Sequence, residues 1–216
     1  MNRTTRILRS SAALVAAFAV SAPAALVSPL LAQTPAASPD LDRALSALRG
    51  IDSMQAAFTQ IDRNGSRVSG TLTLKRPGRI RFQYQPGVPM LIVSDGSAMT
   101  FVDYEARQVQ RWPIKNSPLG ALLDPARDVK KYGRLISSGP GGIVIEVRDR
   151  SHPEYGVMTF RFQPRGGAPG GLELTGWTSL DSQKKQTSIQ LSGHRYGVAV
   201  SDAMFKYNDP RRPARR

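Results

Sequence analysis

The sequence predicts a mainly β protein with a few helices, in which one antiparallel sheet forms a sandwich or a barrel. Two observations carry this prediction. Short stretches of alternating apolar and polar residues follow one another at close spacing, which is typical of half-buried strands. Turn signals separate the stretches, among them Asn64-Gly65, Asp95-Gly96 and the glycine- and proline-rich runs 139–142 and 165–171.

The N-terminus has the layout of a secretory signal peptide over residues 1–32. Its positive start contains Arg3, Arg6 and Arg9. A charge-free apolar run, 12–20, and small residues follow, so cleavage after Ala32 and an earlier cut near Ala24 or Ala25 both fit. The run is shorter than the about 20 residues that a membrane-spanning helix needs, although a retained anchor is the alternative interpretation.

The rest of the chain predicts one domain with short ends. Removing 32 of the 216 residues leaves 184, enough for one domain with a sizeable core. Residues 33–39 have the composition of a linker, 40–210 form the expected domain, and 211–216 form a basic tail that we expect to be disordered. The chain has no cysteine, which excludes disulfides and a lipid-modified N-terminal cysteine.

The net charge of +14 falls to +7 for residues 40–210 once the three signal arginines and the four tail arginines are removed. A basic body indicates an acidic partner, such as lipid head groups or an acidic protein. We do not expect nucleic acid as a partner, because no nucleic-acid motif is present and the protein is exported.

The first expected elements are a helix and a hairpin. Asp40 is expected to cap a helix with Leu41, Leu45 and Leu48 on one stripe, which ends at Gly50. After Ser53, alternation predicts a strand with Met54, Ala56 and Phe58 on one face, and the turn at Asn64-Gly65 leads to a return strand over 69–75. Further strands are expected at 79–85, 89–94, 98–103, 107–112, 134–138, 143–148, 156–163, 171–180, 185–192 and 198–206.

One segment between the strands has a helical pattern. Ser117 is a candidate cap, Pro118 fits the first helical position, and Leu119, Leu122 and Leu123 form an apolar stripe. Residues 128–132 are expected to add another turn. We expect this segment and the first helix to lie across one face of a strongly curved sheet.

The strand over 79–85 has two different faces, because side chains alternate along a strand. The apolar face has Ile80, Phe82 and Tyr84, and the opposite, polar face has Arg79, Arg81 and Gln83. The two arginines are expected to be solvated or to dock an acidic partner. Trp112 and Trp177 are expected to be structural.

Residues for catalysis or metal binding are sparse. His152 and His194 are the two histidines; both are expected at the surface, and no spacing indicates a metal site or a catalytic triad. Four aspartates sit near turns, where their carboxylates bond the local backbone: Asp95, Asp103, Asp149 and Asp181. We therefore expect a binding or carrier protein without catalytic residues, metal or cofactor. A periplasmic hydrolase and a structural sheet protein with a filled core are the alternatives.

Several motifs in this order resemble the periplasmic outer-membrane lipoprotein carrier family, the LolA-type carriers. They are Phe58-Thr59-Gln60, the strand from Gly70 to Arg76-Pro77, Phe82-Gln83-Tyr84, Ser94-Asp95-Gly96, Ser117-Pro118-Leu119, the strand from Trp177 to Asp181, and the ending from Phe205 to Pro210, which resembles that family's last strand. The resemblance covers roughly residues 40–210.

The resemblance implies a half-open, unclosed antiparallel β-barrel of about 11 strands, with helices lying over its concave face as a lid. It implies a periplasmic, monomeric carrier that takes lipid-modified proteins from an inner-membrane ATP-driven extractor to an outer-membrane acceptor. Arg76 is the implied latch of the lid. The implied lining of the lipid cavity is Ile80, Phe82, Tyr84, Ile92, Phe101, Leu119, Leu122 and Leu123. A lipid- or glycolipid-binding or -sensing protein of the same fold is the alternative.

Overall fold

The computed structural model describes residues 38–114, 119–123 and 129–211. These residues belong to one compact unit, Ala37–Arg216. Its strands are β1 (Ser53–Asp62), β2 (Arg67–Lys75), β3 (Arg79–Tyr84), β4 (Met90–Asp95), β5 (Ala98–Asp103), β6 (Gln108–Pro113), β7 (Gly133–Gly139), β8 (Gly142–Arg148), β9 (Val157–Pro164), β10 (Leu172–Leu180) and β11 (Gln186–Tyr196). Its helices are α1 (Pro39–Arg49), α2 (Gly120–Leu123) and α3 (Val129–Tyr132), with short 3-10 turns η2 (Pro153–Tyr155), η3 (Pro169–Gly171) and η4 (Asp202–Phe205).

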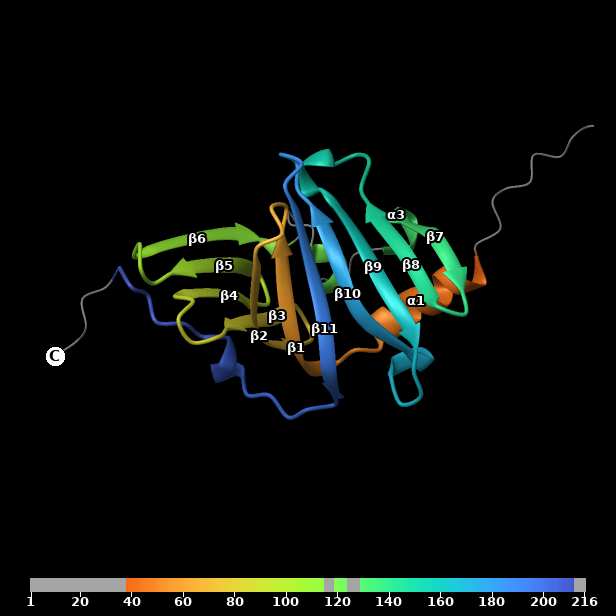
Figure 1. Ribbon diagram of the computed structural model, residues 1–216, viewed down its shortest axis with the longest axis horizontal. Coiled ribbons are helices and arrows are strands. Elements are labelled where there is room, and N and C mark those ends of the chain that lie inside the picture. The colour runs from red at the N-terminus through yellow and green to blue at the C-terminus, as the bar shows by residue number, and fades with distance from the viewer. Residues whose placement is uncertain (1–37, 115–118, 124–128, 212–216) are drawn as a thin grey trace, which may run out of the picture. The chain divides into compact units, whose positions relative to one another are not determined.

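The strands form a single antiparallel sheet in the order β6-β5-β4-β3-β2-β1-β11-β10-β9-β8-β7. The first and last strands pair in the middle of the sheet, while β6 and β7 form its two edges (Figure 1). The two edges do not pair within the described residues, so the sheet is unclosed. This architecture confirms the expected mainly β fold with an open antiparallel barrel.

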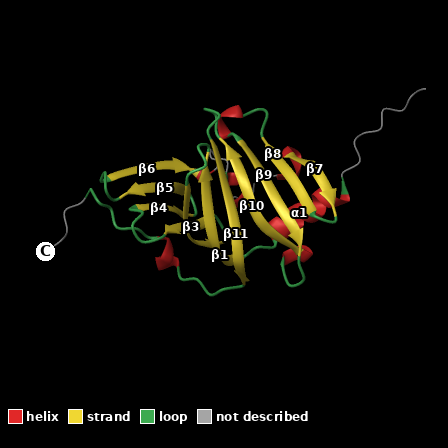
Figure 2. Cartoon of the chain, viewed as in Figure 1, coloured by secondary structure: helices red, strands yellow, loops and turns green. Residues whose placement is uncertain are grey.

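The order of the strands explains why helices lie on the sheet. Strands β6 and β7 are consecutive in the sequence but occupy opposite edges, so the chain between them has to cross the sheet. That connection contains α2 and α3, and its Leu122, Leu123 and Val129 are buried in the main hydrophobic core. The first helix lies on the same core and contacts β7, β8 and β10 (Figures 1 and 2). Both helical segments therefore cover one face, as expected, and we call it the inner face.

Alternation sets which residues reach the inner face. Met54, Ala56 and Phe58 of β1 are buried, and the same period continues across β2 and β3. Phe58 packs edge-on against both Phe82 and Tyr84, with ring centroids 5.3 Å apart in each pair. Such pairs contribute about 0.5–1.5 kcal/mol each beyond the area that they bury.

A glycine makes room for this aromatic cluster. Gly70 of β2 lies opposite Phe58 of β1 in register. A Cβ at position 70 would lie 2.8 Å from the Phe58 ring and closer still to the backbone of Gln83. The glycine therefore leaves room for the Phe58 ring beside β2. Trp177, which packs edge-on against Phe82, is buried in the same cluster and is structural, as expected.

The C-terminal segment contradicts the expected strand over 198–206. It runs over the outer face of β3 and β4 and contains the 3-10 turn η4, whose Phe205 is buried against Leu91, Val93 and Val102. Because β11 already occupies the edge of β1, the segment has no free strand edge beside it. Side chains of the sheet bond its carbonyl groups instead. The resemblance of this ending to the family's last strand therefore does not extend to its secondary structure.

The basic outer side of β3 binds this C-terminal segment. Arg81 donates to the carbonyls of Met204 and Lys206, each at 3.0 Å, and its side chain also contacts Gln83. Arg79 lies 3.6 Å from the carboxylate of Asp202. Both arginines were expected to be solvated or to dock a partner; in the structure they hold the protein's own C-terminal segment.

Lys75 fastens the same segment one strand further along. Its Nζ donates to the Val200 carbonyl at 2.9 Å and to Asp202 Oδ1 at 2.7 Å. The hydroxyl of Ser53 donates to the Val198 carbonyl at 2.8 Å. The segment is thereby attached through side chains to the outer face near the start of β1 and the end of β2, where Thr73 is buried.

We predict that Arg81→Ala loosens the C-terminal segment without unfolding the sheet. The change removes two hydrogen bonds from a charged donor and leaves two carbonyls without these partners, so we expect a loss of about 1–3 kcal/mol in the free energy of unfolding. Urea unfolding and protease cleavage around Met204 measure both effects. Arg161→Ala, which removes an outward arginine on β9, is the matched control; equal cleavage in the two variants would refute the assignment.

Two further expectations need correction. The N-cap of α1 is Ser38 rather than Asp40, because Pro39 begins the helix and places Asp40 in its first turn, where it accepts a hydrogen bond from Ser138. The side chain of His194 is buried rather than exposed: it fills the space beside β10 and bonds the Leu174 carbonyl at 2.8 Å. The end of α1 at Gly50 and the extra turn around 129–132 are confirmed.

Candidate functional site

The inner face contains the residues that were expected to line a lipid cavity. Ile80, Phe82 and Tyr84 are buried in the main core, and so are Leu122 and Leu123 of α2. The other three expected residues, Ile92, Phe101 and Leu119, are only partly buried. In register, Ile92 lies opposite both Phe82 and Phe101, so these three share the inner face. We call Ile80, Phe82, Tyr84, Ile92 and Phe101 the apolar floor.

The floor is least covered toward the β6 edge. Phe82 of β3 is 3% exposed, whereas Ile92 of β4 and Phe101 of β5 are partly exposed. Trp112 of β6 is also partly buried and packs against the main core. The floor is therefore buried over β3 and partly open over β4 and β5.

The first helix covers the other half of the inner face. Its buried stripe consists of Leu41, Ala44, Leu45, Ala47 and Leu48, which matches the expected apolar spacing. Polar contacts fix its N-terminal half: Asp40 accepts from Ser138 of β7 at 2.6 Å, and Asp42 pairs with Lys130 of α3 at 2.8 Å.

Arg76 fixes the opposite end of the same helix. Its Nη2 donates to the Leu48 carbonyl at 2.8 Å and its Nε donates to the Ile51 carbonyl at 2.9 Å. These carbonyls lie in the last turn of α1 and just beyond it, where backbone oxygens lack partners within the helix and favour a positive charge. The chain at Arg76 is held as well, because its backbone N–H donates to the Asp52 carbonyl at 2.7 Å.

Burial lowers the pKa of Arg76; the nearby carboxylate of Asp52 opposes this effect, and the charge of Arg49 adds to it. A guanidinium stays protonated at neutral pH even so. Arg76 is thus a charged donor, largely removed from water, between the sheet and the end of a covering helix.

The turn that follows Arg76 contacts the second covering segment. The backbone N–H of Gly78 donates to the Leu123 carbonyl of α2 at 3.1 Å. Gly78 has a φ of 70°, and a Cβ there would lie 2.6 Å from the Gly96 carbonyl oxygen. Only glycine fits this position without strain, since it combines a left-handed backbone with a close backbone approach.

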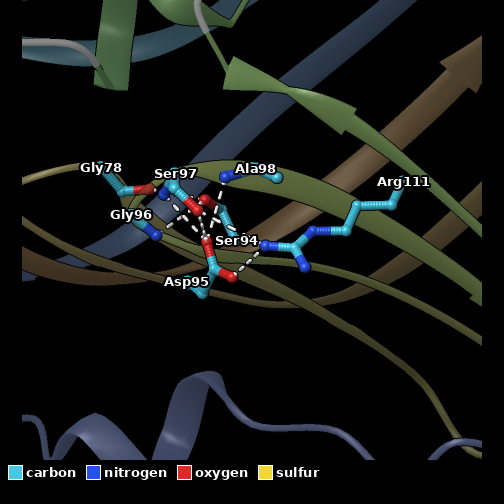
Figure 3. Close-up of polar contacts among 7 residues, drawn as sticks. All are labelled: Gly78, Ser94, Asp95, Gly96, Ser97, Ala98 and Arg111. Carbon is cyan, nitrogen blue, oxygen red and sulfur yellow. Dashed lines mark hydrogen bonds and ion pairs between the residues drawn. The ribbon is translucent and has the colours of Figure 1, made fainter.

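The turn between β4 and β5 supports the Gly78 turn (Figure 3). The buried hydroxyl of Ser94 donates to the Gly78 carbonyl at 2.7 Å and accepts from the Gly96 N–H at 3.2 Å. Asp95 Oδ1 accepts the backbone N–H groups of Ser97 and Ala98 and the Ser97 hydroxyl. Its other oxygen, Oδ2, pairs with Arg111 of β6 at 2.6 Å (Figure 3).

The pKa of Asp95 lies below its ordinary value. Partial burial is the largest single influence and acts to raise this pKa, but hydrogen bonds from Ala98 and Ser97, together with the charge of Arg111, outweigh it. A carboxyl with a lowered pKa in the fold stabilises the folded state above its unfolded-chain pKa of about 3.9. This stabilisation is lost as the pH falls through the lower, folded-state value.

We therefore predict a pH-dependent difference in unfolding free energy between the wild type and Asp95→Asn. The wild type is expected to be more stable near about pH 6, and the gap is expected to narrow as the pH falls below about 3.9, because the carboxyl of the unfolded chain then takes up a proton before the folded one does. Urea unfolding at several pH values measures the gap. A gap that is constant with pH would contradict the role of the carboxylate charge.

Open grooves flank the two ends of the floor. One, of about 680 Å³, lies beyond Tyr84 and is lined by Gln83, Tyr84, Gln85, Pro86, Gly87, Val88, Pro89 and Glu105. Another, of about 670 Å³, adjoins Arg76 and is lined by Asp52, Ser53, Lys75, Arg76, Val198, Ala199, Val200 and Ser201. Neither groove includes Phe82, which is buried against Phe58 and Trp177.

Groups for metal chemistry do not gather in the described part of the chain, where no three His, Asp or Glu side chains form a possible metal site. His152 is exposed beside Glu154, as expected, and the four turn aspartates Asp95, Asp103, Asp149 and Asp181 accept hydrogen bonds from their local backbone. Among residues 38–114, 119–123 and 129–211, no helix is long and apolar enough to span a membrane.

An unclosed antiparallel sheet with a buried apolar inner face, covered by helices that few polar bonds fasten, defines a class of binding proteins that enclose apolar ligands. The sequence model described as "Outer membrane lipoprotein carrier protein LolA" matches residues 49–208. The chain belongs to this family of carriers. The family is periplasmic and non-enzymatic, in agreement with the sequence-based expectations.

Two relatives by sequence agree with this assignment. An outer-membrane lipoprotein carrier protein of Dechloromonas aromatica is 31% identical over 191 residues, which cover 84% of this chain and 88% of that protein. The protein of the same description from Legionella pneumophila is 40% identical over 180 residues, covering 77% and 84%. The crystal structure of LolA superfamily protein NE2245 from Nitrosomonas europaea aligns with a TM-score of 0.47 at 12% identity, over 79% of this chain and 97% of that one.

Sequence reasoning missed two residues that position the Arg76 turn, Gly78 and Ser94. The signals for them were present in the sequence. A glycine directly after Arg76-Pro77 indicates a position that needs a left-handed backbone, and a small polar residue at the end of the apolar strand β4 indicates a buried hydrogen bond.

Proposed function

We propose that this protein binds the acyl chains of lipid-modified proteins against the apolar floor and carries them through the periplasm. In this proposal an inner-membrane ATP-driven extractor loads the carrier and an outer-membrane acceptor unloads it. The carrier acts as a monomer, after removal of residues 1–32, with a linker over 33–39, the carrier domain over 40–210 and a basic tail over 211–216. The supporting observation is the Arg76 contact, which joins the sheet to the end of the helix that covers its apolar face.

Energetics favour a covered floor that can open. Each buried methylene contributes about 0.8 kcal/mol, so leaving one acyl chain in water costs on the order of 10 kcal/mol. A carrier without cargo has the same problem with its own apolar inner face, and in this proposal α1 and α2 cover that face. The helices act as a lid in this proposal, and their packing on the inner face corresponds to a closed lid.

The latch has a strength that cargo can overcome. Arg76 makes two hydrogen bonds from a charged group, each contributing about 1.5–3 kcal/mol to holding the lid. Their sum is smaller than the gain from burying an acyl chain, so loading can open the lid. When cargo leaves the carrier at the acceptor, the same two hydrogen bonds form again, and their formation favours release of the cargo.

The test is to purify the tagged protein from the envelope of a diderm bacterium and to identify by mass spectrometry what co-purifies. We expect acylated lipoproteins, and we expect that the same lipoproteins are absent when their acylated cysteine is replaced. Recovery of glycolipid alone would favour the lipid-sensing alternative, and recovery of neither would contradict the proposal.

A further inference from the structure

The three-residue turn Arg76-Pro77-Gly78 holds both covering segments, but through different groups. The Arg76 guanidinium bonds the end of α1, at Leu48 and Ile51. The Gly78 backbone N–H bonds the end of α2, at Leu123. The side chain and the backbone of one turn therefore reach the C-terminal ends of two segments that are far apart in the sequence.

We propose that the Gly78 N–H on the Leu123 carbonyl is a second latch, and that Ser94 is the positioning residue that sets it. This inference rests on the proposed function to the extent that α1 and α2 act as a lid. It adds that, within the described residues, two different groups of the turn hold the two helices: the Arg76 side chain bonds the end of α1, and the Gly78 backbone bonds the end of α2.

Ser94 has the contacts that this role needs. Its side chain is fully buried, its hydroxyl donates to the Gly78 carbonyl at 2.7 Å, and it accepts from the Gly96 N–H at 3.2 Å. The hydroxyl thus joins the two turns, at 78 and 96, that approach closely enough to exclude a side chain at Gly78. The hydrogen bond from Ser94 fixes the peptide group that follows Gly78, and the backbone angles of Gly78, with a φ of 70°, relate this group to the preceding one, whose N–H donates to Leu123.

Removing the hydroxyl is expected to free the turn locally. In Ser94→Ala the Gly78 carbonyl and the Gly96 N–H lose a buried partner, which is unfavourable unless the turn moves toward water. A shifted turn no longer presents its N–H to Leu123, while Arg76 keeps its own bonds to α1. The expected result is a lid that is loose at α2 and still fastened at α1.

The decisive measurement uses NMR on the empty wild-type protein, which avoids any variant that fails to fold. A through-hydrogen-bond coupling between the Gly78 nitrogen and the Leu123 carbonyl carbon is expected. Its absence, with the coupling across sheet pairs such as β1 and β2 present, would overturn the second latch.

Amide hydrogen exchange then tests Ser94. In Ser94→Ala the Gly78 amide is expected to exchange about tenfold faster or more, as the loss of a buried bond implies, while the sheet amides of Leu72 and Phe82 keep their rates. Ser94→Thr retains the hydroxyl and is expected to restore slow exchange at Gly78. Ser97→Ala, which removes a hydroxyl from the same turn without touching Gly78, is the matched control.

An unchanged Gly78 rate in Ser94→Ala, or an equal acceleration at Leu72 and Phe82, would refute the positioning role in favour of general stability. Neither experiment involves cargo. A protein that shows the coupling and the exchange pattern but binds no lipoprotein would retain the second latch and lose the proposed function, so the two failures are distinguishable.

Discussion

Replacing Arg76 with leucine is expected to leave cargo loading possible and to reduce transfer to the acceptor by at least about tenfold. Leucine cannot donate to the Leu48 and Ile51 carbonyls, so the closed lid loses two hydrogen bonds from a charged donor. Each such bond contributes about 1.5–3 kcal/mol, and about 1.4 kcal/mol corresponds to a tenfold change in an equilibrium. The equilibrium therefore shifts toward the open lid, which retains cargo.

The experiment follows a purified, loaded carrier as it delivers a lipoprotein to acceptor-containing vesicles. Binding of an apolar fluorescent dye to the empty protein reports lid opening independently, and it is expected to rise in Arg76→Leu. Arg67→Leu, which removes an exposed arginine at the start of β2, the strand that leads to Arg76, is the matched control. Transfer by Arg76→Leu at the rate of the control would show that Arg76 is no latch.

Replacing Phe82 with alanine is expected to lower the free energy of unfolding by about 3–5 kcal/mol, the range for removing a buried aromatic ring. Phe82 is 3% exposed and packs edge-on against Phe58 and Trp177, so its removal leaves a cavity in the centre of the floor. Urea unfolding, followed by circular dichroism, measures the loss.

The control for Phe82 is Tyr104→Ala, which removes an aromatic ring that is 37% exposed in the turn after β5. Exposed substitutions of this kind usually change stability by less than about 0.5 kcal/mol. A loss in Phe82→Ala as small as that of the control would mean that Phe82 is not packed under the closed lid.

Local patterns predicted most of the sheet. Strand alternation at Met54, Ala56 and Phe58 and the turn at Asn64-Gly65 depend on only a few neighbouring residues, so the sequence predicts them. The predicted strand limits are confirmed to within about two residues, except that β11 extends four residues further. The resemblance to the carrier family added what local patterns lack: the open barrel and the position of Arg76.

The wrong predictions concern residues whose structure depends on contacts with distant parts of the sequence. The segment 198–206 alternates like a strand, but no free edge is available to it, so Arg81 and Lys75 bind its carbonyls over the outer face. Nothing in the sequence around His194 marks it as buried. Strand β10 pairs with β11 only from Gly176 to Leu180, and His194 lies beside the earlier part of β10, which does not pair with β11, where it bonds the Leu174 carbonyl.

The same difference between local patterns and long-range contacts applies to the candidate site. Alternation alone predicts that Ile80, Phe82 and Tyr84 share a face, but it does not distinguish a core from a floor under a lid. Gly78 contacts Ser94, 16 residues away in the sequence, and Leu123, 45 residues away. No spacing pattern in the sequence predicts these contacts.

The central claim is that acyl chains of lipoproteins bind to the apolar floor, on the inner face that α1 and α2 cover in part. Replacing Phe82 with a photo-crosslinking phenylalanine analogue tests it most directly, with the same analogue at Gln83, the next residue on the opposite face, as the control. After irradiation of cells, position 82 is expected to crosslink to acylated lipoproteins and position 83 is not. Crosslinking of lipoproteins at 83 with none at 82 would contradict the account.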